Sequence, residues 1–99
     1  MIVMDVMEEN IEIPSFNFKF KTYSNGQLAV FLQDYNGFPL AEISIREDTV
    51  DLNIDEFIFK DYSENTTLAN MLYDSELIKS SNRFVLIGKH LCPICQIVT

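Results

Sequence analysis

The sequence has few of the residues on which enzymes rely: one histidine, two cysteines, three glycines and no tryptophan in 99 residues. His90 is the only side chain whose ordinary pKa lies near neutrality. The chain has no glycine-rich phosphate loop, nucleophile elbow or two-histidine metal motif. These absences predict that the protein is not an enzyme. An enzyme that acts through a pair of carboxylates is the weakest alternative, since sequence alone cannot show two carboxylates that converge.

Basic residues and long apolar runs are also scarce. Seven Lys and Arg stand against fifteen Asp and Glu, which gives a net charge of -8. Such a surface repels nucleic acid and anionic membranes, and it favours a basic protein partner. The longest apolar run is Leu28–Leu32, and the start at Met1 carries no basic leader. Two cysteines cannot form the disulfide framework of a small secreted domain, so we expect a cytoplasmic protein.

The chain does contain clear strand patterns, and its length suits a single domain over residues 1–99. From Phe16, apolar and polar residues alternate with the period of two that is typical of a half-buried strand. Asn25-Gly26 predicts a tight hairpin turn into a second strand over 27–33. A second turn near Gly37 leads to a third strand over 40–45. These three strands predict an antiparallel meander.

The second half predicts more strands and one helix. Alternation over 50–55 predicts a fourth strand that continues as extended chain through Phe59. A helix is expected from about Glu64 to Tyr73, with Ser63 or Asn65 as its cap. Strands over 83–87 and 91–98 flank Gly88, and residues 2–7 favour an edge strand. The predicted fold class is α+β, an antiparallel sheet of about five to seven strands with one helix packed on one face.

Negative charge is concentrated in the first part of the chain, since residues 1–56 hold eleven acids and three bases. Five carboxylates without a base between them fall within ten residues: Glu47, Asp48, Asp51, Asp55 and Glu56. On a strand, Asp51 and Asp55 would share one side, and residues two apart would stand about 6.6 Å from each other, roughly as backbone phosphates do. This segment is therefore the candidate partner-binding surface. The alternative is a solvated acidic face that only keeps the protein soluble.

The segment from Asp51 to Tyr62 also carries part of a calcium-loop pattern. Asp51, Asn53 and Asp55 match its first ligand positions, but Glu56 and Tyr62 stand where that loop needs Gly and Glu. A calcium site is therefore not expected.

The second candidate site lies near the end of the chain. His90, Cys92 and Cys95 could supply three of the four ligands of a zinc ion, with the fourth from a carboxylate, water or a second copy. Buried strand cysteines are the favoured interpretation, and a redox pair is a third one. No cofactor is therefore assigned, and a zinc-stabilised structural or assembly module remains the alternative function.

Three segments, Tyr23–Ala29, Asn36–Ile43 and Glu56–Asn65, resemble a family of small uncharacterised proteins that are encoded on plasmids, conjugative elements and phages. The resemblance covers about Tyr23 to Cys95, and its most specific block is Phe-Ile-x-Lys-Asp-Tyr-Ser-Glu-Asn. The chain departs from the family at Thr66, Thr67 and the paired cysteines. The resemblance supplies no catalytic residues. It implies that the protein belongs among small acidic inhibitors of host defence, including anti-CRISPR and antirestriction proteins.

These observations predict a non-enzymatic inhibitor encoded by a phage or plasmid. We expect it to bind a basic nucleic-acid-handling protein of the host, first of all a CRISPR effector nuclease, through the carboxylates of 47–56. No direct contact with nucleic acid or membrane is expected. Both a monomer and a homodimer remain open, because an edge strand can pair between copies.

Overall fold

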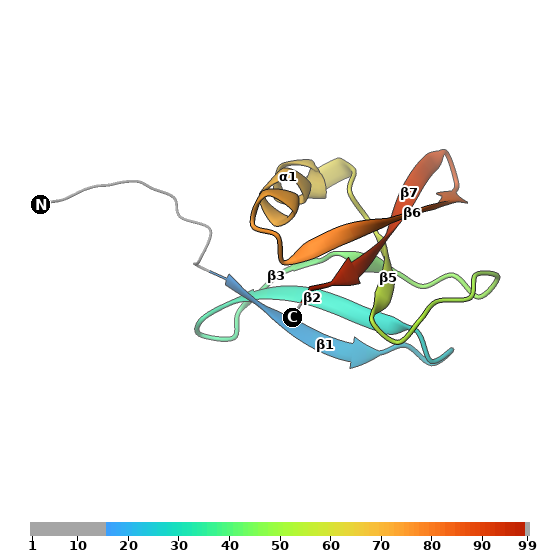
Figure 1. Ribbon diagram of the computed structural model, residues 1–99. Coiled ribbons are helices and arrows are strands. Elements are labelled where there is room, and N and C mark those ends of the chain that lie inside the picture. Colours follow the sequence, from blue (N-terminus) through green and yellow to red (C-terminus); the bar gives the residue numbers. More distant parts are fainter. Residues whose placement is uncertain (1–15, 99) are drawn as a thin grey trace, which may run out of the picture.

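A computed structural model describes residues 16–98, which form seven strands in two antiparallel sheets and one helical segment (Figure 1). The predicted α+β class is confirmed, but the strands are divided between two sheets instead of one. The first sheet has the order β1-β2-β3 and the second β4-β5-β7-β6. The elements are β1 (Phe16–Thr22), β2 (Leu28–Asp34), β3 (Pro39–Glu42), β4 (Ser44–Ile45), β5 (Glu56–Phe59), the 3-10 turn η2 (Ser63–Asn65), α1 (Thr66–Asp74), β6 (Ile78–Ile87) and β7 (His90–Ile97). The predicted strand over 2–7 lies outside the described residues.

The first hairpin follows its sequence pattern. Phe18 pairs with Leu32 and Phe20 with Val30, so these four side chains share one face of β1 and β2, and Phe18, Val30 and Leu32 join the core there. Gly26 closes the turn with a φ of 90°, a left-handed conformation that costs glycine little. The predicted hairpin turn at Asn25-Gly26 is therefore confirmed.

The predicted strand over 40–45 is divided by the step from one sheet to the other. The fully buried Ile43 joins the sheets, because its N–H donates to the Val30 carbonyl (3.0 Å) and its carbonyl accepts from the Lys60 N–H (2.8 Å). Ser44 is buried, although the alternation places it outside. Its Oγ accepts a hydrogen bond from the Val30 N–H at 2.8 Å, which satisfies the buried hydroxyl.

The predicted strand over 50–55 is wrong, because these residues form a loop without strand pairing. Ile54 is 96% exposed, whereas Val50 and Leu52 pack against the second sheet. This packing reproduces a period of two without a hydrogen-bonded ladder. The strand begins only at Glu56, after a turn in which the Glu56 N–H donates to the Asn53 carbonyl.

The helix lies where it is predicted, but no side chain caps it at Ser63 or Asn65. The buried Asn65 side chain instead donates to the carbonyls of Lys60 (2.9 Å) and Glu42 (3.2 Å). Ala69 and Leu72 form the buried side of α1. The Asn65 amide thus does not cap the helix, because this residue is fully buried and its side chain instead bonds the carbonyls of Lys60 and Glu42.

The closing hairpin is longer than predicted. The strand predicted to begin at 83 begins at Ile78, and residues 80–82 form a bulge within it, where Asn82 has a φ of 65°. Gly88, with a φ of 60°, makes the turn to β7, and the predicted closing strand is confirmed. The turn end of this hairpin points away from the first sheet (Figure 1).

The protein has two apolar clusters, one on each face of the second sheet. The larger lies between the two sheets and α1 and includes Leu32, Phe57 and Leu72. The smaller lies on the other face and includes Ile58 and Ile94, with Val50 and Leu52 of the loop packed against it. The loop before β5 therefore covers the outer face of the second sheet. None of the described helical segments has the length and apolar character to cross a membrane.

Candidate functional site

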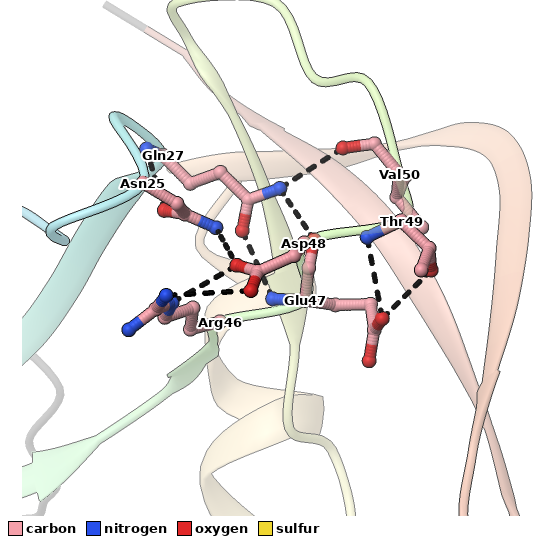
Figure 2. A network of polar contacts seen from close by, with 7 residues as sticks. All are labelled: Asn25, Gln27, Arg46, Glu47, Asp48, Thr49 and Val50. Atoms are coloured by element: carbon pink, nitrogen blue, oxygen red, sulfur yellow. Dashed lines mark hydrogen bonds and ion pairs between the residues drawn. The ribbon is translucent and has the colours of Figure 1, made fainter.

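The acidic loop, residues 46–55, holds four of the five carboxylates selected from the sequence. Its backbone is bound by one side chain from the first hairpin, Gln27 (Figure 2). The Gln27 amide donates to the carbonyls of Glu47 (2.7 Å) and Val50 (3.0 Å), and its Oε1 accepts from the Glu47 N–H (3.0 Å). Three backbone groups of the loop are thus fixed to the start of β2 by one residue.

Asp48 lies on the exposed side of this loop. Its Oδ1 accepts hydrogen bonds from Arg46 Nε at 3.0 Å and Asn25 Nδ2 at 2.7 Å, and its Oδ2 accepts from Arg46 Nη2 at 3.3 Å (Figure 2). The hydrogen bonds from Arg46 and then Asn25 lower the pKa of the Asp48 carboxyl below its ordinary value. Asp48 is therefore a fixed, ionised carboxylate that already shares its charge with Arg46.

Glu47 turns its carboxylate back onto the loop. Its Oε2 accepts from Thr49 Oγ1 at 2.7 Å and from the Thr49 N–H at 3.3 Å (Figure 2). This contact helps to close the bend at 47–49, so Glu47 contributes more to the loop's shape than to its outer surface.

Asp51 and Asp55 have the most exposed carboxylates of the set apart from Asp48. The Asp51 carbonyl accepts from Arg83 Nη2 at 2.9 Å, and Asp51 is exposed. Asp55 Oδ2 accepts from Gln96 Nε2 at 3.3 Å, and the Asp55 carbonyl accepts from the Ile97 N–H. Both residues are therefore anchored mainly through their backbones, but they do not form the strand row expected from the sequence.

Glu56 is a different kind of residue from the other four. It is only 3% exposed, so the prediction that it belongs to a contact surface is wrong. Its Oε1 accepts from Arg83 Nη1 at 3.1 Å and from the Asn53 N–H at 2.9 Å. The segment has no base of its own after Arg46, but the fold supplies one from β6, 27 positions later. Glu56 therefore helps to position the loop from the buried side.

The loop and the first hairpin enclose a hollow of about 410 Å³. It is lined by residues 25–28 of the turn and by Asp48 and residues 50–54 of the loop. Asp48 and Asp51 are the two acidic residues of its wall. This arrangement can accept a lysine or arginine side chain of a partner, because a cation gains from carboxylates and carbonyls that are already oriented.

The candidate zinc residues are not brought together. Cys92 belongs to the cluster on one face of the second sheet and Cys95 to the cluster on the other, so the two thiols cannot bind one ion or form a redox pair. Among residues 16–98, no group of three His, Cys, Asp or Glu has a geometry that could hold a metal. His90 instead stacks on Tyr62, with ring centroids 3.7 Å apart.

Both cysteines are free and buried, which confirms the favoured interpretation from the sequence. Burial raises the pKa of the Cys95 thiol to about 11, and the Tyr73 hydroxyl lies 3.3 Å from its sulfur. Burial also raises the pKa of Cys92. The neutral thiol is the form that such apolar surroundings favour, whereas metal binding and redox chemistry need a thiolate.

Three residues that organise the site were missed from the sequence: Asn25, Gln27 and Arg83. The sequence pattern places Asn25 only in the hairpin turn. Gln27 and Arg83 reach partners 20 or more positions away, so no local spacing marks them.

Comparisons with protein family models, with curated proteins and with solved structures found no match. The resemblance to proteins of mobile elements stays a prediction.

Proposed function

We propose that this chain is a non-enzymatic inhibitor of host defence, encoded by a phage or plasmid and acting in the host cytoplasm. It binds a basic nucleic-acid-handling protein through the acidic loop. Asp48, Asp51 and Asp55 make the contact, Glu47 shapes the loop beside them, and Glu56 supports it from below. A CRISPR effector nuclease is the first partner to test, because the sequence resembles small acidic proteins of mobile elements.

The observation that carries this proposal is an exposed set of carboxylates on a loop with a fixed backbone. Gln27 holds the loop at Glu47 and Val50, and Arg83 holds it at Asp51. Ordering a loop on binding costs about 1–2 kcal/mol per residue. A loop that is already held in place avoids part of this entropy cost when it binds a partner. Fixed carboxylates on such a loop favour recognition of a charged partner.

The chemistry of the partner follows from the charge of the loop. Proteins that handle nucleic acid line their channels with lysine and arginine, and a net charge of -8 attracts such surfaces over a distance. The hollow beside Asp48 and Asp51 fits a long basic side chain. A compact domain that occupies the basic channel of the partner would exclude nucleic acid from that channel without any chemical step.

The experiment is an inhibition assay with a purified CRISPR effector and its guide RNA. Cleavage of a target DNA is measured against increasing amounts of this protein, and the affinity is measured at about 0.05 M and about 0.3 M salt. We expect inhibition that weakens as salt rises and that is lost when target DNA is bound first. No binding at low salt would contradict the proposal for that effector. Tight binding that does not respond to salt would instead indicate an apolar interface.

A further inference from the structure

We propose that Asn36-Gly37, in the turn between β2 and β3, is a self-modification site at which the asparagine loses ammonia and becomes aspartate or isoaspartate. This inference is independent of the proposed function. The reaction needs the next backbone nitrogen to attack the asparagine side chain, and glycine hinders this attack least because it has no Cβ. The chain contains two such pairs, Asn25-Gly26 and Asn36-Gly37. The structure distinguishes between them.

The two turns have the same backbone arrangement. In the first turn, the Gly26 N–H donates to the Tyr23 carbonyl at 2.9 Å. In the second turn, the Gly37 N–H donates to the Asp34 carbonyl at the same distance, 2.9 Å. The glycine φ is 90° in the first turn and 85° in the second. The turn backbone therefore restrains the attacking nitrogen alike in both places, and a difference in reactivity must come from the surroundings.

The surroundings of the two asparagine side chains differ. Asn25 Nδ2 donates to Asp48 Oδ1 at 2.7 Å, and Asn25 Oδ1 accepts from the Gln27 N–H at 3.0 Å (Figure 2). Both ends of this amide are thus held in one orientation. Asn36 is exposed, and only its backbone N–H is bound, by Asp34 Oδ1 at 2.9 Å. Its side-chain amide has no hydrogen-bond partner within the part of the chain that the structure describes, so it is free to turn toward the Gly37 nitrogen.

The hairpin that carries Asn36 also opens more easily than the first hairpin. β1 and β2 pair over seven residues of each strand. β2 and β3 pair at three positions, with an irregularity between Leu32 and Gln33, and β3 is the edge of the first sheet. Residues 35–40 are all exposed. A local opening that frees the Gly37 N–H therefore disrupts few other contacts.

The reaction uses only the chain and water. The Gly37 nitrogen loses its proton to solvent and attacks Cγ of Asn36, so that a new C–N bond closes a five-membered succinimide ring. The side-chain nitrogen takes up a proton and leaves as ammonia. Water then opens the ring at either carbonyl carbon, which gives aspartate or an isoaspartate whose main chain runs through the side-chain carbon. Nothing is oxidised or reduced, and either product adds one negative charge to the turn.

The same reaction at Asn25 would disturb the acidic loop. A carboxylate at this position would stand where Nδ2 now lies 2.7 Å from Asp48 Oδ1, and two carboxylates so close repel each other. The hydrogen bond from Asn25 to Asp48 therefore has a second effect, because it protects the residue whose modification would break the contact between the first hairpin and the loop. The reactive pair is left at the opposite end of β2.

The test measures the reaction at both asparagines in the folded, full-length chain. The purified protein is kept at mildly alkaline pH and cleaved at low pH, and each Asn-Gly peptide is followed over time for the gain of about 1 Da that replaces an amide by a carboxylate. We expect Asn36 to react about tenfold or more faster than Asn25, because only Asn25 must break a bond to a charged group. In denaturant, where both asparagines are simply followed by glycine, the two rates should approach each other.

A variant tests the cause of the protection. Asp48→Ala removes the partner of Asn25 Nδ2 and should speed the reaction at Asn25 by about threefold or more, with no change at Asn36. Asp74→Ala is the matched control, since it removes the same charge from an exposed position on α1, and it should change neither rate. Circular dichroism checks that each variant is folded.

If Asp48→Ala does not fold, the comparison of the folded and denatured unaltered chain decides. Equal rates at the two asparagines in the folded chain would overturn the proposal, and so would an Asn36 that reacts only in denaturant. A folded Asp48→Ala protein in which Asn25 reacts no faster than in Asp74→Ala would overturn the protective role of Asp48.

Discussion

Arg83 Nη1 lies 3.1 Å from Glu56 Oε1, and the other terminal nitrogen of Arg83 donates to the Asp51 carbonyl at 2.9 Å. One guanidinium thus neutralises a buried carboxylate and holds the acidic loop above it. The relationship joins β6 to the start of β5 and to the loop between β4 and β5. The position of the candidate binding surface therefore depends on Arg83.

Arg83→Ala should therefore destabilise the protein, because Glu56 keeps its charge in a buried place without a partner. We expect a loss of about 1–3 kcal/mol in the free energy of unfolding, measured by chemical denaturation. Glu56→Gln in the same background should recover part of that loss, since a neutral amide is less costly to bury. Equal stability of Arg83→Ala and the unaltered chain would show that solvent, not Arg83, satisfies Glu56.

Gln27→Ala should loosen the acidic loop. The variant removes three hydrogen bonds to the backbone at 47 and 50, which should cost about 1–2 kcal/mol and speed amide exchange at Glu47. Gln33→Ala is the matched control, because Gln33 makes one side-chain hydrogen bond, to Asn17, and does not touch the loop. Similar exchange at Glu47 in the two variants would contradict the role given to Gln27.

Stability should fall as pH rises from about 9 to about 11. Burial raises the pKa of Cys95 from 9.0 to about 11 and that of Tyr23 from 10.0 to about 12, and it raises the pKa of Tyr73 as well. Over this range the unfolded chain loses protons that the folded chain keeps, so folding is favoured below the range and loses that advantage as pH climbs. Cys95→Ala should reduce the fall in melting temperature over pH 9–11. An identical fall in this variant would show that the thiol takes no part.

The fold class was readable from the sequence because most of its signals are local. Alternation from Phe16, the Asn25-Gly26 turn and the helical spacing after Glu64 each depend on neighbours in the chain. The division into two sheets was not readable, because Ile43 bonds to Val30 in one sheet and to Lys60 at the end of the other. The alternation over 50–55 was misleading because Val50 and Leu52 pack on a sheet without joining it.

The candidate site was only partly predictable. The acidic segment could be identified from the sequence, since a run of carboxylates without a basic residue depends only on neighbours in the chain. The burial of Glu56 could not be predicted, because its partner Arg83 comes from a strand 27 positions later. The separation of Cys92 and Cys95 follows from strand geometry, in which residues three apart point to opposite faces.

The central claim is that exposed carboxylates of the acidic loop bind a basic partner. The most direct test compares the affinity of three folded proteins for the same purified effector: the unaltered chain, Asp51→Lys with Asp55→Lys, and Asp74→Lys with Glu76→Lys. The two variants change the net charge equally, and both pairs of side chains are exposed. We expect the loop variant to lose binding by about a hundredfold or more at low salt, with only a small loss for the control. Equal affinities of the two variants would contradict the account.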